Sequence, residues 1–379
     1  MAGANPHPIQ YFKMRLFLSA IALLSGLSAL ACSSSPVSGQ VMVTEDFEFL
    51  SGGRRLSGII DQPANGEARA LIVFVHGSGP TDIRRENRYV DLRRRFAELG
   101  IASVVWDKPG RGRSEGEFDP NQPLDESARE VLDAVAYLRR EDVPGAQKIG
   151  IWGTSRGGWV APMALAEDPE IEFWISVSGV PAEDNKYYLM RSNLPLEGRT
   201  LEETQRLMEE WKRGREIFMK GGDYDSYLAA TRNLRNDTSV LYFAGDLTGS
   251  RAEYEAEQAA FLRARDEVQF DENLSVIRVR DFDAMVSSLD IDVLALLGER
   301  DTNVDWQAAK ALYEATIGRN DSATLNIRTF PDCNHSLNVS KTGSVREVEG
   351  TPLNMGIKCD GYYETQLEWL KEHVVAESR

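Results

Sequence analysis

The chain has 379 residues, of which 42% are hydrophobic, and this length fits one large domain that carries an insertion. Its 59 acidic and 43 basic residues give a net charge of −16, and a surface of that sign repels phosphate backbones. Composition and charge therefore argue against nucleic acid as a partner. We interpret the basic run Arg93–Arg95 as the solvated face of a helix.

The N-terminus predicts an export signal. Lys13 and Arg15 precede an uncharged apolar run that ends in small residues before Cys32. This run is short for a membrane span and has the charged-then-apolar order of a signal peptide. Ala29-Leu30-Ala31-Cys32 resembles the bacterial lipobox, in which the cysteine is acylated and becomes the new N-terminus, although leucine is usual where Ala29 stands.

We therefore expect residues 1–32 to be a lipoprotein-type signal peptide and residues 33–45 to be a flexible tether. The mature protein would then be exported to the bacterial cell envelope, and a lipid on Cys32 would be its only contact with the membrane. A plain cleaved signal with an incidental cysteine is the alternative. Either Met1 or Met14 could be the true start.

From residue 46 the chain reads as a hairpin followed by alternating strands and helices. The hairpin pairs Asp46–Leu50 with Leu56–Ile60. The strands that follow begin with the continuous apolar run Ala70–Val75 and continue with Ala102–Trp106, Ile149–Trp152, Phe173–Val177, Val293–Leu297 and Leu325–Phe330. The first expected helix has its inner stripe over Leu92–Leu99, the second begins near Pro123 and the third ends near Leu165. Two more helices span Val304–Ile317 and Gly361–Val375. This order predicts an α/β fold with a mostly parallel sheet covered by helices on both faces.

The alternation stops between residues 182 and 283, where the sequence is charged and helical. The expected helices are Leu201–Phe218, Tyr224–Leu234 and Arg251–Arg265. We predict a core of residues 46–181 and 284–379, with residues 182–283 as a helical cap over the carboxyl edge of the sheet, where open α/β sheets bind ligands. Aromatic residues of this segment could line a pocket or form the core of the cap: Tyr187, Tyr188, Trp211, Tyr224 and Tyr227.

Two segments match the pattern Gly-x-Ser-x-Gly, and their contexts differ. Gly153–Gly157 follows an apolar strand and opens into helix-forming residues, so its Ser155 would project from a tight strand-to-helix turn. Gly112–Gly116 has no strand directly before it and no helix directly after it. We therefore interpret Ser155 as a nucleophile and Ser114 as a loop residue.

A serine hydroxyl needs a base to take its proton. The expected mature chain offers His76, His335 and His373. His76 ends the first long strand, before the serine, and His373 lies among charged residues of the last helix, which predicts a surface position. His335 follows the last strand, in agreement with the order serine, acid, histidine, and is our candidate base.

The acid that orients the base should lie between Ser155 and His335, just after a strand. Asp301 is our choice, and Glu299 and Asp305 are nearby competitors. An acidic residue in this position is often only a helix cap, which is the alternative role for Asp301.

An oxyanion needs preorganised N–H donors. We expect them from the amide of Arg156, which follows the nucleophile, and from Ser78, in the glycine-rich turn after the first long strand. The chain has no phosphate-cradling loop, no dinucleotide fingerprint and no metal-ligand spacing, so we expect no cofactor and no metal. In an exported protein Cys333 and Cys359 could pair and pin the loop of His335; two separate buried thiols are the alternative.

These motifs together resemble the α/β-hydrolase superfamily, from about Asp46 to Val375 without the cap. The matching segments are His76–Pro80, Asp107–Ser114, Gly153–Gly157, Gly298-x-x-Asp301-x-x-Val304 and His335. The His-Gly-Ser-Gly-Pro turn and the helical insert are similar to bacterial esterases related to the serine aminopeptidase and dienelactone-hydrolase groups. The chain departs from the pattern at Asp292, where proline is usual, and at Asp332–Asn334, where small residues are common.

The sequence thus predicts an enzyme, a serine hydrolase that acts on a small acyl ester or a peptide-like molecule. A carboxylesterase with the triad Ser155, Asp301 and His335 is the main expectation. The same scaffold serves aminopeptidases, thioesterases and acyltransferases, because the cap selects the substrate. A catalytically retired lipoprotein that binds a partner in the envelope is the alternative of a different class.

Overall fold

The computed structural model describes residues 40–87, 89–245, 247, 249–349 and 356–376. The expected signal peptide, the expected lipidation site Cys32 and residues 33–39 of the expected tether lie outside the described residues. The predicted tether, residues 33–45, extends too far toward the C-terminus. The first strand, β1 (Met42–Ser51), begins inside residues 33–45 because it pairs along its whole length with β2 (Arg54–Pro63).

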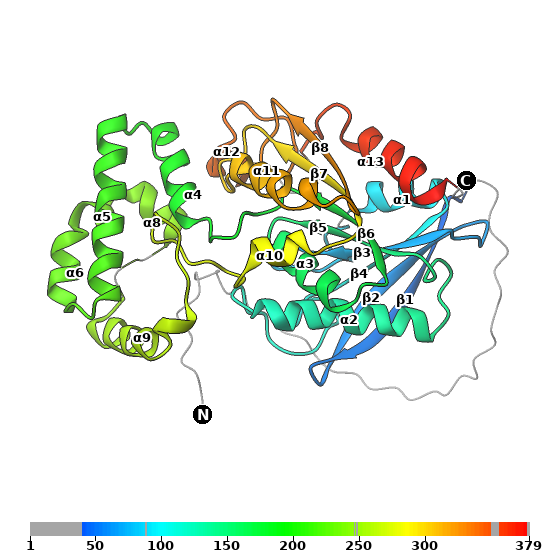
Figure 1. Cartoon of the computed structure of the whole chain (residues 1–379), viewed down its shortest axis with the longest axis horizontal. Helices are drawn as coiled ribbons and strands as arrows, with labels where there is room; N and C mark the ends of the chain where they lie inside the picture. The colour runs from blue at the N-terminus through cyan, green and yellow to red at the C-terminus, as the bar shows by residue number, and fades with distance from the viewer. Residues whose placement is uncertain (1–39, 88, 246, 248, 350–355, 377–379) are drawn as a thin grey trace, which may run out of the picture. The chain divides into compact units, whose positions relative to one another are not determined.

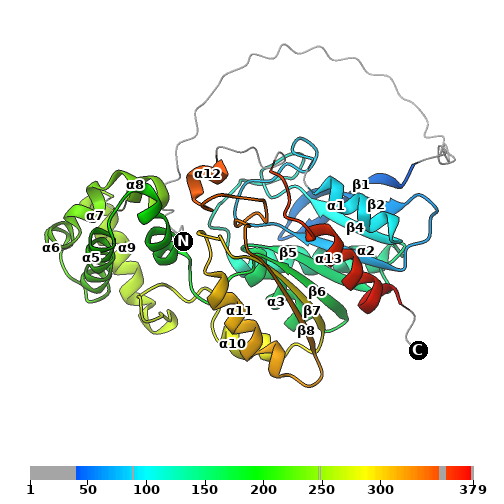
Figure 2. The same ribbon diagram turned by 90° about the horizontal axis from the view of Figure 1, so that it is seen from above.

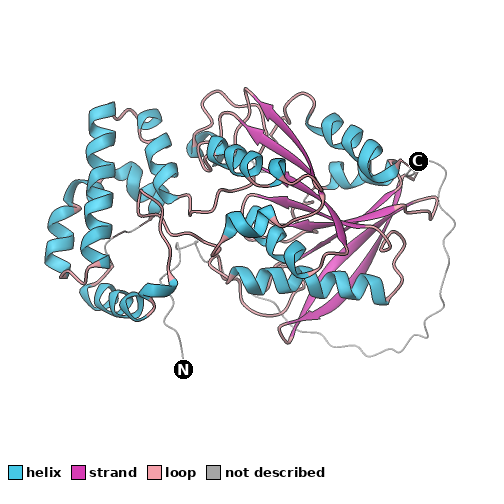
Figure 3. Ribbon diagram, viewed as in Figure 1, coloured by secondary structure: helices cyan, strands magenta, loops and turns pink. Residues whose placement is uncertain are grey.

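The described residues contain an eight-stranded sheet with the order β1-β2-β4-β3-β5-β6-β7-β8 (Figures 1 and 3). The strands after the hairpin are β3 (Ala70–Val75), β4 (Ile101–Trp106), β5 (Ile149–Thr154), β6 (Ile171–Val177), β7 (Asp292–Gly298) and β8 (Thr324–Phe330). β1 with β2 and β2 with β4 pair antiparallel, and the other neighbours pair parallel. The predicted α/β fold with a mostly parallel sheet is confirmed.

Helices cover both faces of this sheet, which explains why its inner strands are apolar throughout. One face packs against α2 (Leu124–Arg140), α3 (Gly157–Glu167), α10 (Phe282–Ser287) and α11 (Trp306–Ala315). The other face packs against α1 (Val90–Glu98), α13 (Tyr362–Leu370) and the π-helical turn Lys371–Val375 that continues it. Each group of helices supplies its own apolar cluster.

The carboxyl ends of the parallel strands gather the loops that matter for chemistry. β3 leads into Gly77 and Ser78, β5 into Ser155, β7 into Asp301 and β8 into His335. Because the four strands run parallel in one sheet, these loops emerge at the same edge.

The insertion is a separate group of helices (Figures 1 and 2). Its helices are α4 (Lys186–Asn193), α5 (Leu201–Met219), α6 (Tyr224–Ala230), α7 (Arg232–Asn236), α8 (Thr238–Ala244) and α9 (Arg251–Arg263). They enclose an apolar cluster of their own around Met190, Leu207 and Trp211. The cap boundary expected at residue 283 falls inside α10, whose Phe282 and Val286 belong to the core of the sheet domain.

The helix expected over Tyr224–Leu234 is divided at Thr231 into α6 and α7. The cause is Glu210 of α5, a buried residue whose carboxylate accepts the backbone N–H groups of Asn233 and Leu234 at 2.9 Å each. A carboxylate that bonds the first free N–H groups of a helix acts as its cap, and here the cap comes from another helix.

The prediction of a solvated face for Arg93–Arg95 is wrong for Arg93. This side chain is buried and forms an ion pair with the equally buried Asp61 of β2. Burial lowers the pKa of Arg93 to about 10. Arg95 lies over the ring of Tyr363 at 4.4 Å, and only Arg94 of the three is exposed.

Within the described residues, no helix combines the length and the apolar character needed to cross a membrane.

Candidate active site

Ser155 occupies the sharp turn between β5 and α3. Its φ angle of 52° lies in the left-handed region, which is strained for a residue with a side chain. The flanking glycines make the turn sterically feasible. A Cβ on Gly157 would stand 2.9 Å from the carbonyl oxygen of Val75, and one on Gly153 would stand 3.0 Å from the carbonyl oxygen of Gly157. This is the physical reason for glycine on both sides of the serine.

The structure brings Ser155, His335 and Asp301 into one hydrogen-bonded chain. His335 Nε2 lies 2.9 Å from Ser155 Oγ, and His335 Nδ1 lies 2.7 Å from Asp301 Oδ2. A carboxylate only accepts, so Nδ1–H donates to Asp301 and Nε2 is left to accept the serine proton. Three groups far apart in the sequence are thus arranged so that His335 can take the serine proton while Asp301 holds the imidazole in place.

Asp301 has both of the roles that the sequence suggests for it. Its Oδ2 faces the imidazole, while Oδ1 accepts the N–H groups of Asn303 and Val304 at 2.9 Å each. The two competing acids are placed elsewhere. Asp305 caps α11 through the N–H groups of Gln307 and Ala308, and Glu299 is exposed.

The charge of Asp301 determines how His335 titrates. Burial lowers the pKa of His335, but the charge of Asp301 and the hydrogen bond to it outweigh this effect, so the pKa lies above its ordinary value of 6.5. Because protonated His335 cannot accept the Ser155 proton, activity should be lost as the pH falls through this raised pKa.

We therefore expect the acid limb of kcat/KM for p-nitrophenyl acetate to have its midpoint above pH 6.5. A pH–rate profile measured from pH 5 to 9 checks this, with buffers held at constant ionic strength. A midpoint at or below the ordinary histidine value would contradict an ion pair between His335 and Asp301 in the free enzyme.

The loop after β3 lies against the nucleophile. A Cβ on Gly77 would stand 3.3 Å from the Cβ of Ser155, so only glycine allows this approach without a shift. The ammonium of Lys108 donates to the Gly77 carbonyl and helps to orient the peptide that carries the Ser78 N–H. Ser78 itself is exposed.

Arg156 directly precedes α3, at its N-cap position, so its amide lies at the positive end of that helix. The sequence prediction used only this amide. The side chain is also buried, and its guanidinium donates to Ser127 Oγ at 3.0 Å and to the Gln122 carbonyl. Burial lowers the pKa of Arg156 to about 10. These bonds tie the turn that carries Ser155 to α2 and to the segment before it. The one signal in the sequence for this structural role is a charged residue directly after the serine.

The second Gly-x-Ser-x-Gly segment has a structural role. Ser114 is buried, donates to the Asp107 carbonyl at 2.6 Å and accepts the N–H of Ser57 at 3.0 Å. The Asp107 carboxylate in turn accepts the N–H groups of Ile83 and Arg113. These bonds fasten the loop to the hairpin, in agreement with the interpretation of Ser114 as a loop residue.

The other two histidines also have local roles. His76 Nε2–H donates to the Trp106 carbonyl at 2.8 Å. His373 is half-buried, and its ring stacks on Trp369 while its Nδ1 lies 3.3 Å from Asp292 Oδ2, so it packs against the protein more closely than a free surface residue. Asp292, which stands where a proline is usual, thus holds the end of the last helix.

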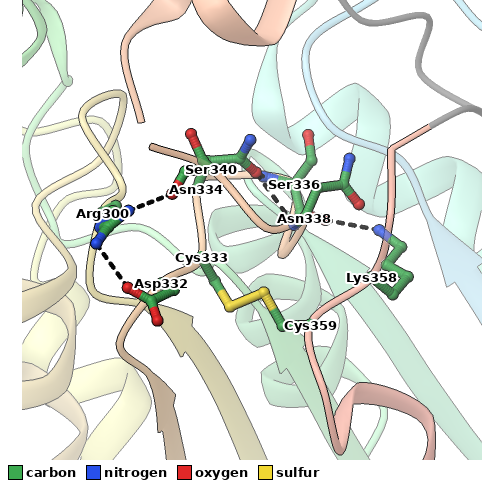
Figure 4. The surroundings of a disulfide bond; sticks show 9 residues. All are labelled: Arg300, Asp332, Cys333, Asn334, Ser336, Asn338, Ser340, Lys358 and Cys359. Atoms are coloured by element: carbon green, nitrogen blue, oxygen red, sulfur yellow. Dashed lines mark hydrogen bonds and ion pairs between the residues drawn. A yellow bond between two sulfur atoms is a disulfide. The ribbon is translucent and has the colours of Figure 1, made fainter. Parts of the chain in front are cut away.

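Cys333 and Cys359 form a disulfide two residues before the candidate base (Figure 4). The same loop is held by an ion pair between Asp332 and Arg300 at 2.6 Å and by Lys358, whose Nζ donates to the Ser336 carbonyl at 2.6 Å (Figure 4). The segment Asp332–Asn334, where the chain departs from the family pattern, is thus held by the disulfide at Cys333 and by the ion pair at Asp332.

Replacement of both cysteines by serine should lower the free energy of unfolding by about 3 kcal/mol, as expected for a bridge that closes a short loop. It should also lower kcat, because the loop of His335 gains freedom. Urea denaturation with and without dithiothreitol measures the first effect. Reduction should bring the wild type to the stability of the double variant and should leave the variant unchanged; a wild type insensitive to the reductant would contradict the prediction.

The aromatic residues of the cap divide between its interior and the site. Trp211 is buried in the apolar cluster, and the hydroxyls of Tyr224 and Tyr227 donate to the carbonyls of Gly249 and Leu247 within the cap. Tyr188 instead donates to the carbonyl of Asp301 at 2.9 Å. Sequence reasoning did not distinguish this tyrosine from the others.

No group of three or more side chains suited to hold a metal ion occurs in the part of the chain that the structure describes. The arrangement that is present can pass a proton from a hydroxyl to an imidazole, and it places glycine-rich backbone and a helix N-terminus beside the hydroxyl.

Comparisons with known proteins agree with this geometry. A family model described as X-Pro dipeptidyl-peptidase (S15 family) matches residues 53–328, which is more than half of the chain. The quorum-quenching protein AidA of Acinetobacter baumannii (strain MDR-ZJ06) is 33% identical over 133 residues, which cover 35% of this chain and 42% of AidA.

A solved structure has a similar fold at low identity, and a second one gives a TM-score just below 0.5. A complex of DcsB with its substrate analogue has a TM-score of 0.50 at 16% identity and covers 88% of this chain and 100% of that one. The Pyrococcus furiosus esterase Pf2001 has a TM-score of 0.49 at 16% identity and covers 88% and 92%. The fold, the serine on its strand-to-helix turn and the family match converge: the chain belongs to the X-Pro dipeptidyl-peptidase (S15) family and is a serine hydrolase of the α/β-hydrolase type.

Proposed function

We propose that the protein is a carboxylesterase that cleaves small acyl esters through a covalent acyl-enzyme. The proposal is carried by one observation, the unbroken path of hydrogen bonds from Ser155 Oγ through His335 to Asp301. A hydroxyl with this partner can become a nucleophile at neutral pH.

In the proposed reaction Ser155 Oγ attacks the acyl carbon while its proton passes to His335 Nε2. The electron pair of the carbonyl moves to its oxygen, which the amides of Ser78 and Arg156 stabilise together with the N-terminus of α3. The imidazolium then gives its proton to the leaving alkoxide as the acyl–oxygen bond breaks. Water repeats the sequence with His335 as the base and releases the acid and free Ser155.

Hydrolysis of a peptide bond is the second candidate, and the match to a dipeptidyl-peptidase family favours it. A peptidase that reads a free N-terminus needs a carboxylate for the ammonium group. Two acidic residues at the base of the cap serve the local backbone instead: Asp184 accepts the N–H groups of Lys186 and Val276, and Asp271 accepts those of Asn273 and Ser275. The ester remains the first candidate, and a substrate panel decides between the two.

A substrate panel tests both candidates. We expect the purified protein to hydrolyse short-chain p-nitrophenyl esters with a higher kcat/KM than dipeptidyl p-nitroanilides with proline in the second position, and thioesters belong in the same panel. A reversed order would replace the esterase by the peptidase. A fluorophosphonate probe provides an independent check, because a retired scaffold would not be labelled at Ser155.

We further propose that the protein is exported and lipid-anchored through Cys32 in the bacterial cell envelope. The lipobox-like residues Ala29–Cys32 support this, and the bond between Cys333 and Cys359 fits an oxidising compartment. Incorporation of radioactive palmitate should be seen with the full chain and lost in Cys32→Ala. Equal incorporation by both proteins would contradict the anchor.

A further inference from the structure

One helix of the cap bonds the loop that carries the candidate acid. Side chains of α4 and of the residue before it donate hydrogen bonds to three consecutive backbone carbonyls. Tyr188 Oη donates to Asp301 at 2.9 Å, and Ser192 Oγ and Asn193 Nδ2 donate to Thr302 at 2.7 and 3.0 Å. Asn185 Nδ2, directly before the helix, donates to Asn303 at 2.8 Å. The loop after β7 is therefore held from the side of the cap, in addition to its own turn.

Asn193 is the junction of this arrangement and is fully buried. Its amide oxygen accepts the backbone N–H of Val345 at 3.0 Å and lies 3.3 Å from the hydroxyl of Thr302. That hydroxyl lies 2.6 Å from the carbonyl of Gly343. One side chain of the cap thus joins the loop of Asp301 to the segment that follows His335.

The same two segments are also joined directly. Arg300 donates to the carbonyls of Ser340 and Lys341 and pairs with Asp332. A Cβ on Gly343 would collide with the carbonyl oxygen of Arg300, so the two backbones are in close contact. A shift of the acid loop would consequently be transmitted to the loop of His335.

α4 cannot move independently of the rest of the cap. Its Met190, and Leu194 directly after it, are buried in the apolar cluster with Leu207 and Trp211 of α5. The position of the whole cap is therefore coupled to the backbone of Asp301 and of the two residues that follow it. A displacement of about 1 Å at a reacting group can cost on the order of 10²-fold in rate.

We propose that Tyr188, Ser192 and Asn193 are positioning residues, through which the cap holds Asp301 in hydrogen-bond reach of His335. This inference rests on the proposed function of the triad. It makes the cap a part of the catalytic machinery and not only a cover that selects the substrate.

The test compares Asn193→Ala and Tyr188→Phe with the wild type, with the rate of inactivation by diisopropyl fluorophosphate as readout. This probe needs no knowledge of the substrate. We expect the inactivation rate constant to fall by about 10–100-fold for Asn193→Ala and by a few-fold for Tyr188→Phe, with little change in the affinity for the probe. The midpoint of the acid limb should move to lower pH, because His335 loses part of the interaction with Asp301 that raises its pKa.

Two control variants remove side-chain hydrogen bonds to backbone carbonyls that lie wholly within the cap. Gln258 Nε2 donates to the carbonyls of Phe218 and Gly222, and Tyr254 Oη donates to that of Gly222 at 2.9 Å. Gln258→Ala and Tyr254→Phe should therefore keep the wild-type rate and midpoint, even where they lose stability.

The outcomes are distinct. If Asn193→Ala does not fold, Tyr188→Phe decides, since it removes one hydroxyl from a half-buried side chain. The positioning role would be overturned if the folded variants kept the wild-type midpoint of the acid limb and their inactivation rate fell only in proportion to the unfolded fraction. A wild type that is not labelled at all would overturn the proposed function, and with it this inference.

Discussion

Replacement of Ser155 by alanine should lower kcat for p-nitrophenyl acetate by about 10³-fold or more, with little change in stability. The variant keeps the imidazole, the acid and the amides beside the site but has no oxygen to attack the acyl carbon. Only hydrolysis by water held in the site would remain. Initial rates at the pH at which the wild type is most active measure the effect.

The chain supplies a control with the same sequence pattern. Ser114→Ala removes two buried hydrogen bonds, to the Asp107 carbonyl and from the Ser57 N–H, and should cost about 1–3 kcal/mol of stability while kcat of the folded protein stays near that of the wild type. The assignment of the nucleophile fails if Ser155→Ala keeps nearly full activity while Ser114→Ala, still folded, loses it.

Asp301→Asn should be the second most damaging change, with a loss of about 10²–10⁴-fold in kcat at neutral pH. Its amide can turn an oxygen to the N–H groups of Asn303 and Val304, as the carboxylate does at 2.9 Å, and the loop is expected to keep its conformation. The NH₂ group would then face His335 and favour the tautomer with the proton on Nε2, which cannot accept the serine proton.

Asp305→Asn is the matched control, because Asp305 caps α11 and asparagine caps helices nearly as well as aspartate does. We expect a kcat within about two-fold of the wild type, which kinetics on short-chain esters will measure. Loss of activity in Asp305→Asn, with activity retained in Asp301→Asn, would show that Asp301 is not the acid of the triad.

Much of the architecture was predictable because the inner strands of the sheet are buried on both faces. A strand such as β3 that is apolar at every position can be read directly from the sequence, and all six residues of Ala70–Val75 are buried. The candidate site was predictable for a related reason. Ser155 directly follows the buried strand β5, Asp301 lies in the loop after the buried strand β7, and His335 lies in the loop after the half-exposed edge strand β8. Parallel strands bring the residues at their carboxyl ends to one edge.

The predictions from the sequence are wrong where a tertiary contact outweighs the local pattern of residue types. Arg93 belongs to a run of three arginines, yet it is buried because Asp61 is its partner on β2. The break between α6 and α7 depends on Glu210 of another helix. In both cases the partner is remote in the chain, and periodicity within a window carries no information about it.

The chemistry of the candidate site is thus local information: which side chain follows which strand, and which glycines make room for it. Its geometry is not local. The hold of α4 on the acid loop depends on hydroxyl and amide groups that meet backbone carbonyls more than a hundred residues further along the chain, as Asn193 meets Thr302. Side chains of this kind carry no hydrophobic pattern, and a carbonyl has no residue identity, so such bonds become visible only when the chain is folded.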